Sequence, residues 1–138
     1  MVRRNQSGMT LLEVVVALTI FWMIVGGMAF LFVQTKDIAD KARDHYVAVN
    51  LAKNRLERAG AFDFTALGFL TETNVVVDVN GAPDTAGSYR RTTTVTAVPA
   101  STNLAEVVVK VEVKNRRTDA FTGEAEELRT YFTVYLVP

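Results

Sequence analysis

The 138-residue sequence contains no cysteine and only one histidine. The absence of cysteine excludes disulfides, thiolate metal sites, thiol nucleophiles and lipoprotein anchoring. One histidine gives little material for a histidine-rich metal site or a Ser/His catalytic pair. No phosphate-binding loop, nucleophile–base pair or carboxylate dyad stands out in the sequence either. We therefore expect a non-enzymatic protein without a cofactor or a metal.

The sequence also has no excess of either charge, because 15 basic and 15 acidic residues give a formal net charge of zero. This balance argues against nucleic acid as a partner, since binding by bulk positive charge needs a basic protein. Nothing in the sequence indicates nucleotide binding. Hydrophobic residues make up 49% and charged residues 22%, which excludes a disordered chain.

The apolar residues are concentrated near the N-terminus. The 20 residues from Val14 to Val33 read VVVALTIFWMIVGGMAFLFV and include no charged side chain. As a helix they would span about 30 Å, the thickness of the hydrocarbon core of a bilayer. The pair Gly26–Gly27 weakens this helix and suggests either close packing between helices or local unwinding. We expect one transmembrane segment.

The flanks of the apolar run predict its orientation and its fate. Arg3 and Arg4 precede it without an acidic residue, so the positive-inside rule places the N-terminus in the cytoplasm. The run is longer than that of a secretory signal, and residues 34–37 (QTKD) do not form a small-residue cleavage site. The segment is therefore expected to remain in the protein, with the C-terminal part across the membrane.

An acidic residue, Glu13, stands at the start of the apolar run. A carboxylate within a bilayer costs about 2.5–3.5 kcal/mol on insertion scales. Glu13 therefore either lies shallow, near the cytoplasmic headgroups, or pairs with a cationic partner.

Residues 7–18 (SGMTLLEVVVAL) resemble the class III signal of type IV prepilins. In that family a membrane peptidase cleaves after the glycine, the new N-terminal residue is N-methylated, and a glutamate follows four residues later. The resemblance implies cleavage between Gly8 and Met9, N-methylation of Met9, and an assembly role for Glu13. Met9 departs from the phenylalanine that is commonest after the cleavage site.

The implied cleavage would give Glu13 a partner. An α-amine has an ordinary pKa of about 7.7–8.0, so the new N-terminus would be mostly protonated near neutrality. In a bundle of such helices, the ammonium of one subunit could pair with the Glu13 carboxylate of its neighbour. Loss of either partner would leave the other as an unpaired charge in apolar surroundings, at a cost of several kcal/mol. The pair would thus fix the axial register between subunits.

The helical pattern continues beyond the apolar run as far as Ala59, and Gly60 offers a stop signal. We predict one helix from Thr10 to Ala59. Its second half has an apolar stripe, which we interpret as domain core rather than as a filament interface: Ile38, Ala42, Tyr46, Val49, Ala52, Leu56 and Ala59. The charged residues expected on its solvent face are Asp37, Lys41, Asp44, Arg55 and Arg58.

After Leu70 the pattern changes to the alternation typical of strands. Strands are predicted at 74–79, 88–98, 106–114 and 128–137, and the third carries valines at every second position. Hairpin-length connections favour a small antiparallel sheet with one face on the helix. The predicted fold is α+β and pilin-like: a long N-terminal helix, its first half transmembrane, packed on a small antiparallel sheet.

Other candidate sites give weak signals. Asp78, Asn80 and Asp84 could supply oxygens to calcium, but their spacing does not match an EF-hand and Asx-Gly-Pro clusters are first of all turns. His45 is expected to be a surface or packing histidine. The basic pairs Arg90–Arg91 and Arg116–Arg117 are expected to be solvated strand-end charges.

Residues 10–21 and 49–59 (VNLAKNRLERA) resemble the minor pilin and pseudopilin class of PilV and GspI. This resemblance implies a subunit that enters, and helps prime, a type IV pilus or a type II secretion pseudopilus. The implied partners are prepilin peptidase, other minor pilins or pseudopilins, the major subunit, the inner-membrane assembly platform and, before assembly, the lipid bilayer. The implied location is the bacterial inner membrane as a single-pass protein with a periplasmic domain, and then the filament.

The expected division is a leader at 1–8, a membrane and filament-core helix at 9–33, its amphipathic continuation at 34–61, and a sheet domain at 62–138. Two alternative functions remain. One is a tip module that binds DNA or a surface through the arginine pairs or the loop 115–124. The other is a signal-anchored periplasmic domain that is never cleaved.

Overall fold

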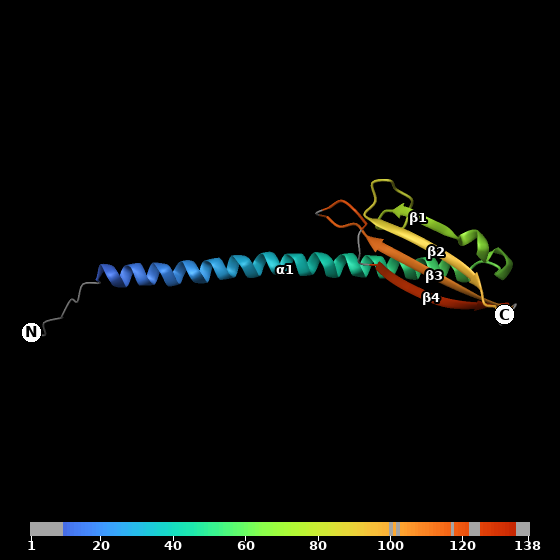
Figure 1. Cartoon of the computed structure of the whole chain (residues 1–138), viewed down its shortest axis with the longest axis horizontal. Coiled ribbons are helices and arrows are strands. Elements are labelled where there is room, and N and C mark those ends of the chain that lie inside the picture. The colour runs from blue at the N-terminus through green and yellow to red at the C-terminus, as the bar shows by residue number, and fades with distance from the viewer. Residues whose placement is uncertain (1–9, 100, 102, 117, 122–124, 135–138) are drawn as a thin grey trace, which may run out of the picture. The chain divides into compact units, whose positions relative to one another are not determined.

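One long helix and a four-stranded sheet make up most of the chain (Figure 1). The computed structural model describes residues 10–99, 101, 103–116, 118–121 and 125–134. The helix α1 runs from Leu11 to Gly60 without interruption, close to the predicted bounds. The strands are β1 (Glu72–Val77), β2 (Tyr89–Ala97), β3 (Leu104–Val113) and β4 (Ala125–Thr133). The predicted α+β fold of pilin-like architecture is confirmed.

The sheet is an antiparallel meander in the order β1-β2-β3-β4, which follows from the short connections between its strands (Figure 1). Its strands lie within a few residues of the predicted ranges; β4 begins at Ala125 rather than at residue 128. A short 3₁₀ helix, η1 (Phe64–Leu70), joins α1 to β1. This helix was not predicted from the sequence.

The chain divides into two compact units, residues 1–41 and 42–138. The core of the second unit lies between the sheet and the C-terminal part of α1. The alternating valines of β3 behave as predicted, since Val107, Val109 and Val111 are all fully buried. From α1 they meet Ala48, Leu51 and Ala52, with Val77 and Tyr89 completing the cluster. Small residues on the helix permit its close approach to the valine face.

The predicted apolar stripe on α1 is correct only near its C-terminal end. Ala52 and Ala59 are buried, but Ile38 and Tyr46 are 66% and 69% exposed, and Ala42 is also exposed. The buried face of α1 instead includes Ala48 and Leu51. The helix turns 100° per residue, and the sheet covers only the face that carries these two residues.

An extra residue in β1 changes which side chains face α1. The pairing of β1 with β2 shifts register between Glu72 and Val75, and Asn74 within this bulge has a φ of 55°. Asparagine tolerates this left-handed conformation better than most residues. Glu72 pairs with the buried Thr93, and Val75 packs against the core. The bulge thus turns both a carboxylate and an apolar residue towards the interior.

The connection between β1 and β2 is fixed by a buried glycine. A Cβ atom on Gly87 would lie 2.2 Å from the carbonyl oxygen of Val77, a clash with backbone that no rotamer change relieves. We predict that Gly87→Ala lowers the free energy of unfolding by about 2 kcal/mol or more. Thermal unfolding of the purified chain in detergent, followed by circular dichroism, measures this loss.

The matched control for this prediction is Gly68→Ala in η1, because nothing lies within 4 Å of a Cβ atom at Gly68. Its unfolding midpoint should stay close to that of the wild type. Equal midpoints for Gly87→Ala and the wild type would contradict the packing described for this connection.

Candidate assembly and processing site

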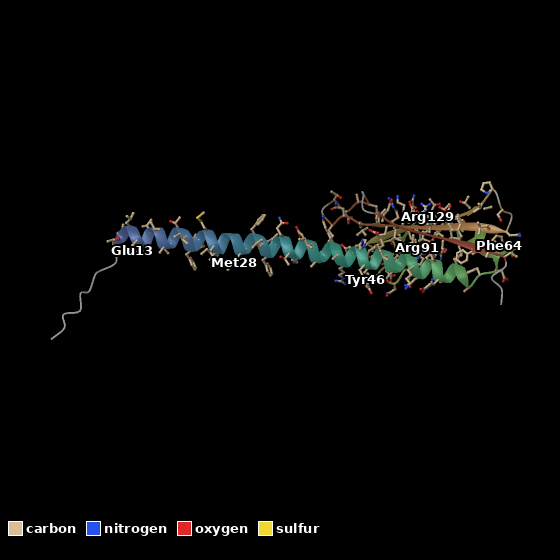
Figure 2. All side chains as sticks on the ribbon, turned by 90° about the horizontal axis from the view of Figure 1, so that it is seen from below. Glu13, Met28, Tyr46, Phe64, Arg91 and Arg129 are labelled. Atoms are coloured by element: carbon tan, nitrogen blue, oxygen red, sulfur yellow. The ribbon has the colours of Figure 1, made fainter. Side chains whose placement is uncertain are left out.

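Glu13 lies in the first turn of α1, where its side chain faces the start of its own helix (Figure 2). Its Oε2 atom is 3.5 Å from the backbone nitrogen of Thr10, and its own backbone N–H donates to the Thr10 carbonyl at 3.0 Å. This is the arrangement of a capping box, in which the third helical residue reaches back to the N-cap. The long contact holds the carboxylate weakly and leaves it accessible. Gly8 and Met9 lie outside the described residues.

The first unit presents apolar side chains on every side. All residues from Leu11 to Val33 are exposed, including Trp22 and Phe32, which are 67% and 75% exposed. By length and composition, this helix could cross a membrane. Its one hydroxyl in the apolar run, on Thr19, donates to the carbonyl of Val15 at 2.8 Å. The Thr19 hydroxyl is therefore satisfied within its own helix, as a lipid environment requires.

Gly26 and Gly27 do not interrupt α1, and nothing lies within 4 Å of a Cβ atom at either position. Alanine would therefore fit at both positions in the chain on its own. A need for glycine here would have to come from contacts with other molecules or from a change in the helix, which are the two interpretations given above.

The basic pairs do not stand free at the strand ends. Arg90 binds Glu112 and lies over the ring of Phe121, with 4.8 Å from its guanidinium carbon to the ring centroid. Arg116 donates to Asp44 on α1 at 3.1 Å. The second arginine of each pair does not share this arrangement. Arg91 is only 5% exposed, and Arg117 lies outside the described residues. The expectation of a solvated charge is therefore wrong for Arg91.

His45 and the Asp78 turn have local partners. The Nδ1 atom of His45 is 2.6 Å from Oε1 of Glu126 in β4, so this histidine joins helix to sheet at the surface. The Oδ1 atom of Asp78 accepts hydrogen bonds from the backbone nitrogens of Asn80 and Ala82, both at 2.9 Å. The bond from Ala82 is the main reason that the pKa of Asp78 is lowered. The turn interpretation is thus supported, and the described residues contain no group of three or more His, Cys, Asp or Glu placed to hold a metal.

A partly buried ion cluster beneath α1 was not predicted from the sequence. The Glu72 carboxylate forms ion pairs with Nε of Arg91 and, at 3.1 Å, with Nη2 of Arg55. It also accepts a hydrogen bond from the hydroxyl of Thr93 at 3.0 Å. Arg55 also donates to the Leu70 carbonyl at 3.0 Å. Figure 2 shows Arg91 between α1 and the sheet. The cluster joins α1, β1 and β2 through one carboxylate.

Arg55 was expected on the solvent face of α1, and this was wrong, because its side chain is 14% exposed. Burial lowers the pKa of its guanidinium; Glu72 opposes this shift, and the nearby charges of Arg91 and Arg58 add to it. A guanidinium stays charged despite such a shift, so two cations share one carboxylate here. The signal in the sequence would have been Arg91 on the inward face of β2, in alternation with Tyr89 and Thr93, whereas the bulge at Asn74 hides the inward position of Glu72.

Comparison with known families bears on the N-terminal segment. Residues 3–29 match the family model of the prokaryotic N-terminal methylation motif. The match supports a type IV pilin-like protein. It spans Gly8, Met9, Glu13 and most of the apolar run. The comparisons with curated proteins and with solved structures give no match.

The expectations on processing, membrane anchoring and a structural role gain support from this match. The motif implies processing by prepilin peptidase and assembly with other pilins. Together with the apolar helix it suggests membrane anchoring. The motif is that of structural subunits rather than of a known enzyme family.

The ion cluster predicts a large effect of a small change. Glu72→Gln keeps the shape of the side chain but leaves Arg55 and Arg91 without a counter-charge. We predict a loss of about 3 kcal/mol in the free energy of unfolding, as for other buried pairs that lose one partner. Thermal or urea unfolding of the full chain in detergent measures it.

Glu127→Gln is the control for this change, because Glu127 pairs with Arg129 on the exposed face of the sheet. Its effect should stay within about 0.5 kcal/mol. A Glu72→Gln protein as stable as the Glu127→Gln protein would mean that the cluster does not hold the helix to the sheet.

Proposed function

We propose that the protein is a minor pilin or pseudopilin subunit that enters, and helps prime, a type IV pilus or a type II secretion pseudopilus. The observation that carries this proposal is the methylation motif at residues 3–29, which includes the start of an exposed apolar helix with Glu13 in its first turn. A helix with exposed apolar side chains on every side is unfavourable in water, whereas a membrane and a filament core each give it apolar surroundings.

In this proposal residues 1–8 are a cytoplasmic leader that prepilin peptidase removes. Residues 9–33 cross the bacterial inner membrane before assembly and form the filament core afterwards. Residues 34–61 continue the helix into the periplasm, and residues 62–138 form the sheet domain there. The placing of Arg3 and Arg4 ahead of the apolar run supports this orientation.

Cleavage between Gly8 and Met9 would place a methylated amine one residue before Thr10. The Glu13 carboxylate holds its own helix start only through a 3.5 Å contact and is exposed, so little must be broken before it pairs with a neighbour's amine. In apolar surroundings such a pair is favourable only when both charges are present. The charge pair therefore selects the register in which every subunit meets the next.

The assignment to the PilV and GspI class rests on residues 10–21 and 49–59. The partners in this proposal are other minor pilins or pseudopilins, the major subunit and the inner-membrane assembly platform. The tip-binding alternative loses support because Arg90 and Arg116 already bind carboxylates of the same chain. We therefore propose a structural role rather than capture of DNA.

The first test is the intact mass and N-terminal sequence of the protein purified from its native membrane. We expect a chain that begins at Met9 and is heavier by about 14 Da, the mass of one added methyl group. Replacement of Gly8 by a bulky residue should give the unprocessed chain as a size marker. A native chain that still begins at residue 1 or 2 would instead favour the uncleaved, signal-anchored domain.

The second test separates assembly from processing. Glu13→Ala should still insert and be cleaved, but its incorporation into filaments should fall by more than about tenfold, since the neighbour's ammonium loses its partner. Immunoblots of membranes and of sheared filaments measure both steps. Thr19→Val is the control, because the Thr19 hydroxyl is satisfied within its own helix. Normal incorporation of Glu13→Ala would rule out the register role.

A further inference from the structure

A small hollow opens at the surface beside the ion cluster, where the turn between β1 and β2 meets α1. Its volume is about 10 Å³, and it lies within the second unit. We call it the arginine hollow, and its polar lining consists of Asn54, Arg55 and Arg58 from α1, Asn80 and Gly81 from the turn, and Arg91 from β2. Gly81 has a φ of +82°, and a Cβ atom there would come within 3.2 Å of both Arg91 and Leu51. Glycine thus lets the turn close over Arg91.

The arginine hollow carries more positive charge than its surroundings compensate. Three guanidinium groups line it, while Glu72 is the carboxylate that binds Arg55 and Arg91. Arg58 forms no ion pair with any carboxylate among the described residues. Repulsion from Arg58 and Arg91 contributes to the lowered pKa of Arg55, after burial as the main cause. An anion in the hollow would relieve this repulsion.

Donors remain available at the hollow. Nε and Nη2 of Arg91 donate hydrogen bonds to Glu72, and its Nη1 donates one to the Gly81 carbonyl. Nε of Arg55 donates a hydrogen bond to the Thr93 hydroxyl. Its Nη2 donates one to the Leu70 carbonyl and forms an ion pair with Glu72. Its Nη1 makes no hydrogen bond to another described residue, yet no buried side-chain nitrogen in the described part of the chain lacks a partner. Nη1 of Arg55 therefore reaches solvent at the hollow.

We propose that the arginine hollow binds a carboxylate from a neighbouring subunit in the assembled filament. The hollow has room for a water-sized group, such as one oxygen of a carboxylate, since its volume is about 10 Å³. A planar carboxylate can place one oxygen there and the other against Arg58, which matches the fork geometry that guanidinium groups favour. The source of the carboxylate rests on the proposed function, but the chemistry of the site does not.

The first experiment tests the chemistry without any filament. The full chain in detergent micelles, labelled with ¹⁵N, is titrated with sodium formate against sodium chloride at constant ionic strength, and the arginine Nε–Hε resonances are followed. We expect saturable shifts for Arg55 and Arg91. Arg58→Gln should weaken formate binding by about tenfold, as expected when one charge-assisted hydrogen bond is lost.

Lys53→Gln is the matched control, since Lys53 is an exposed cation of the same helix that pairs with Glu57 and does not line the hollow. Its formate affinity should equal that of the wild type. Shifts that do not saturate, or an Arg58→Gln affinity equal to that of Lys53→Gln, would overturn the site. Inorganic phosphate that binds as tightly as formate would overturn the assignment to a carboxylate.

The second experiment tests the source of the carboxylate. Arg58→Gln and Lys53→Gln are expressed in cells that assemble the filament, and the fraction of each in sheared filaments is compared. We expect Arg58→Gln to be depleted several-fold and Lys53→Gln to match the wild type. Equal incorporation would show that the carboxylate does not come from a neighbouring subunit. A wild-type chain absent from filaments would instead defeat the proposed function, and the formate titration would still report on the site.

Discussion

The Glu72 carboxylate is the contact on which the second unit depends, because it binds cations from two separate elements. Arg55 reaches it from α1 and Arg91 from β2, while Glu72 itself stands at the start of β1. Apolar packing between alanines and valines is tolerant of small rotations of the helix, since it has no direction. A partly buried carboxylate between two guanidinium groups is less tolerant, because each hydrogen bond that is lost leaves a charge without its partner. We infer that the cluster sets the rotation of α1 on the sheet.

Glu72 and Glu13 both lie in or beside apolar surroundings, and they differ in how they are neutralised. Glu72 finds both of its cations within the chain, so this carboxylate needs no cation from another molecule. Glu13 finds only a 3.5 Å contact to the start of its own helix. Under the proposed function this difference is the physical basis of assembly, because only the unsatisfied carboxylate gains a cation when a second subunit arrives.

Much of the fold could be predicted from the sequence because simple periodicities of apolar residues mark its helix and strands. The valines of β3 alternate as expected, and a single helix follows from an apolar run that continues into a helical stripe without proline. The ion cluster could not be predicted, since a charged residue on a helix is expected to face water. The inward turn of Glu72 depends on a bulge at Asn74, and no local pattern marks where one strand will hold an extra residue. Arg55 and Arg91 were placed on the surface because charged side chains are expected to face water.

The candidate assembly site was found from sequence for the opposite reason. Glu13 is conspicuous because its neighbours are apolar, and the role proposed for it needs no tertiary contact within the chain. The arginine hollow is hidden in the sequence because its three cations come together only when α1, the turn at Gly81 and β2 are in place. A carboxylate that enters the hollow would therefore recognise the folded second unit, whereas the amine that meets Glu13 recognises only a helix. The two contacts together would let a filament accept a subunit by its membrane helix and still discriminate between folded domains.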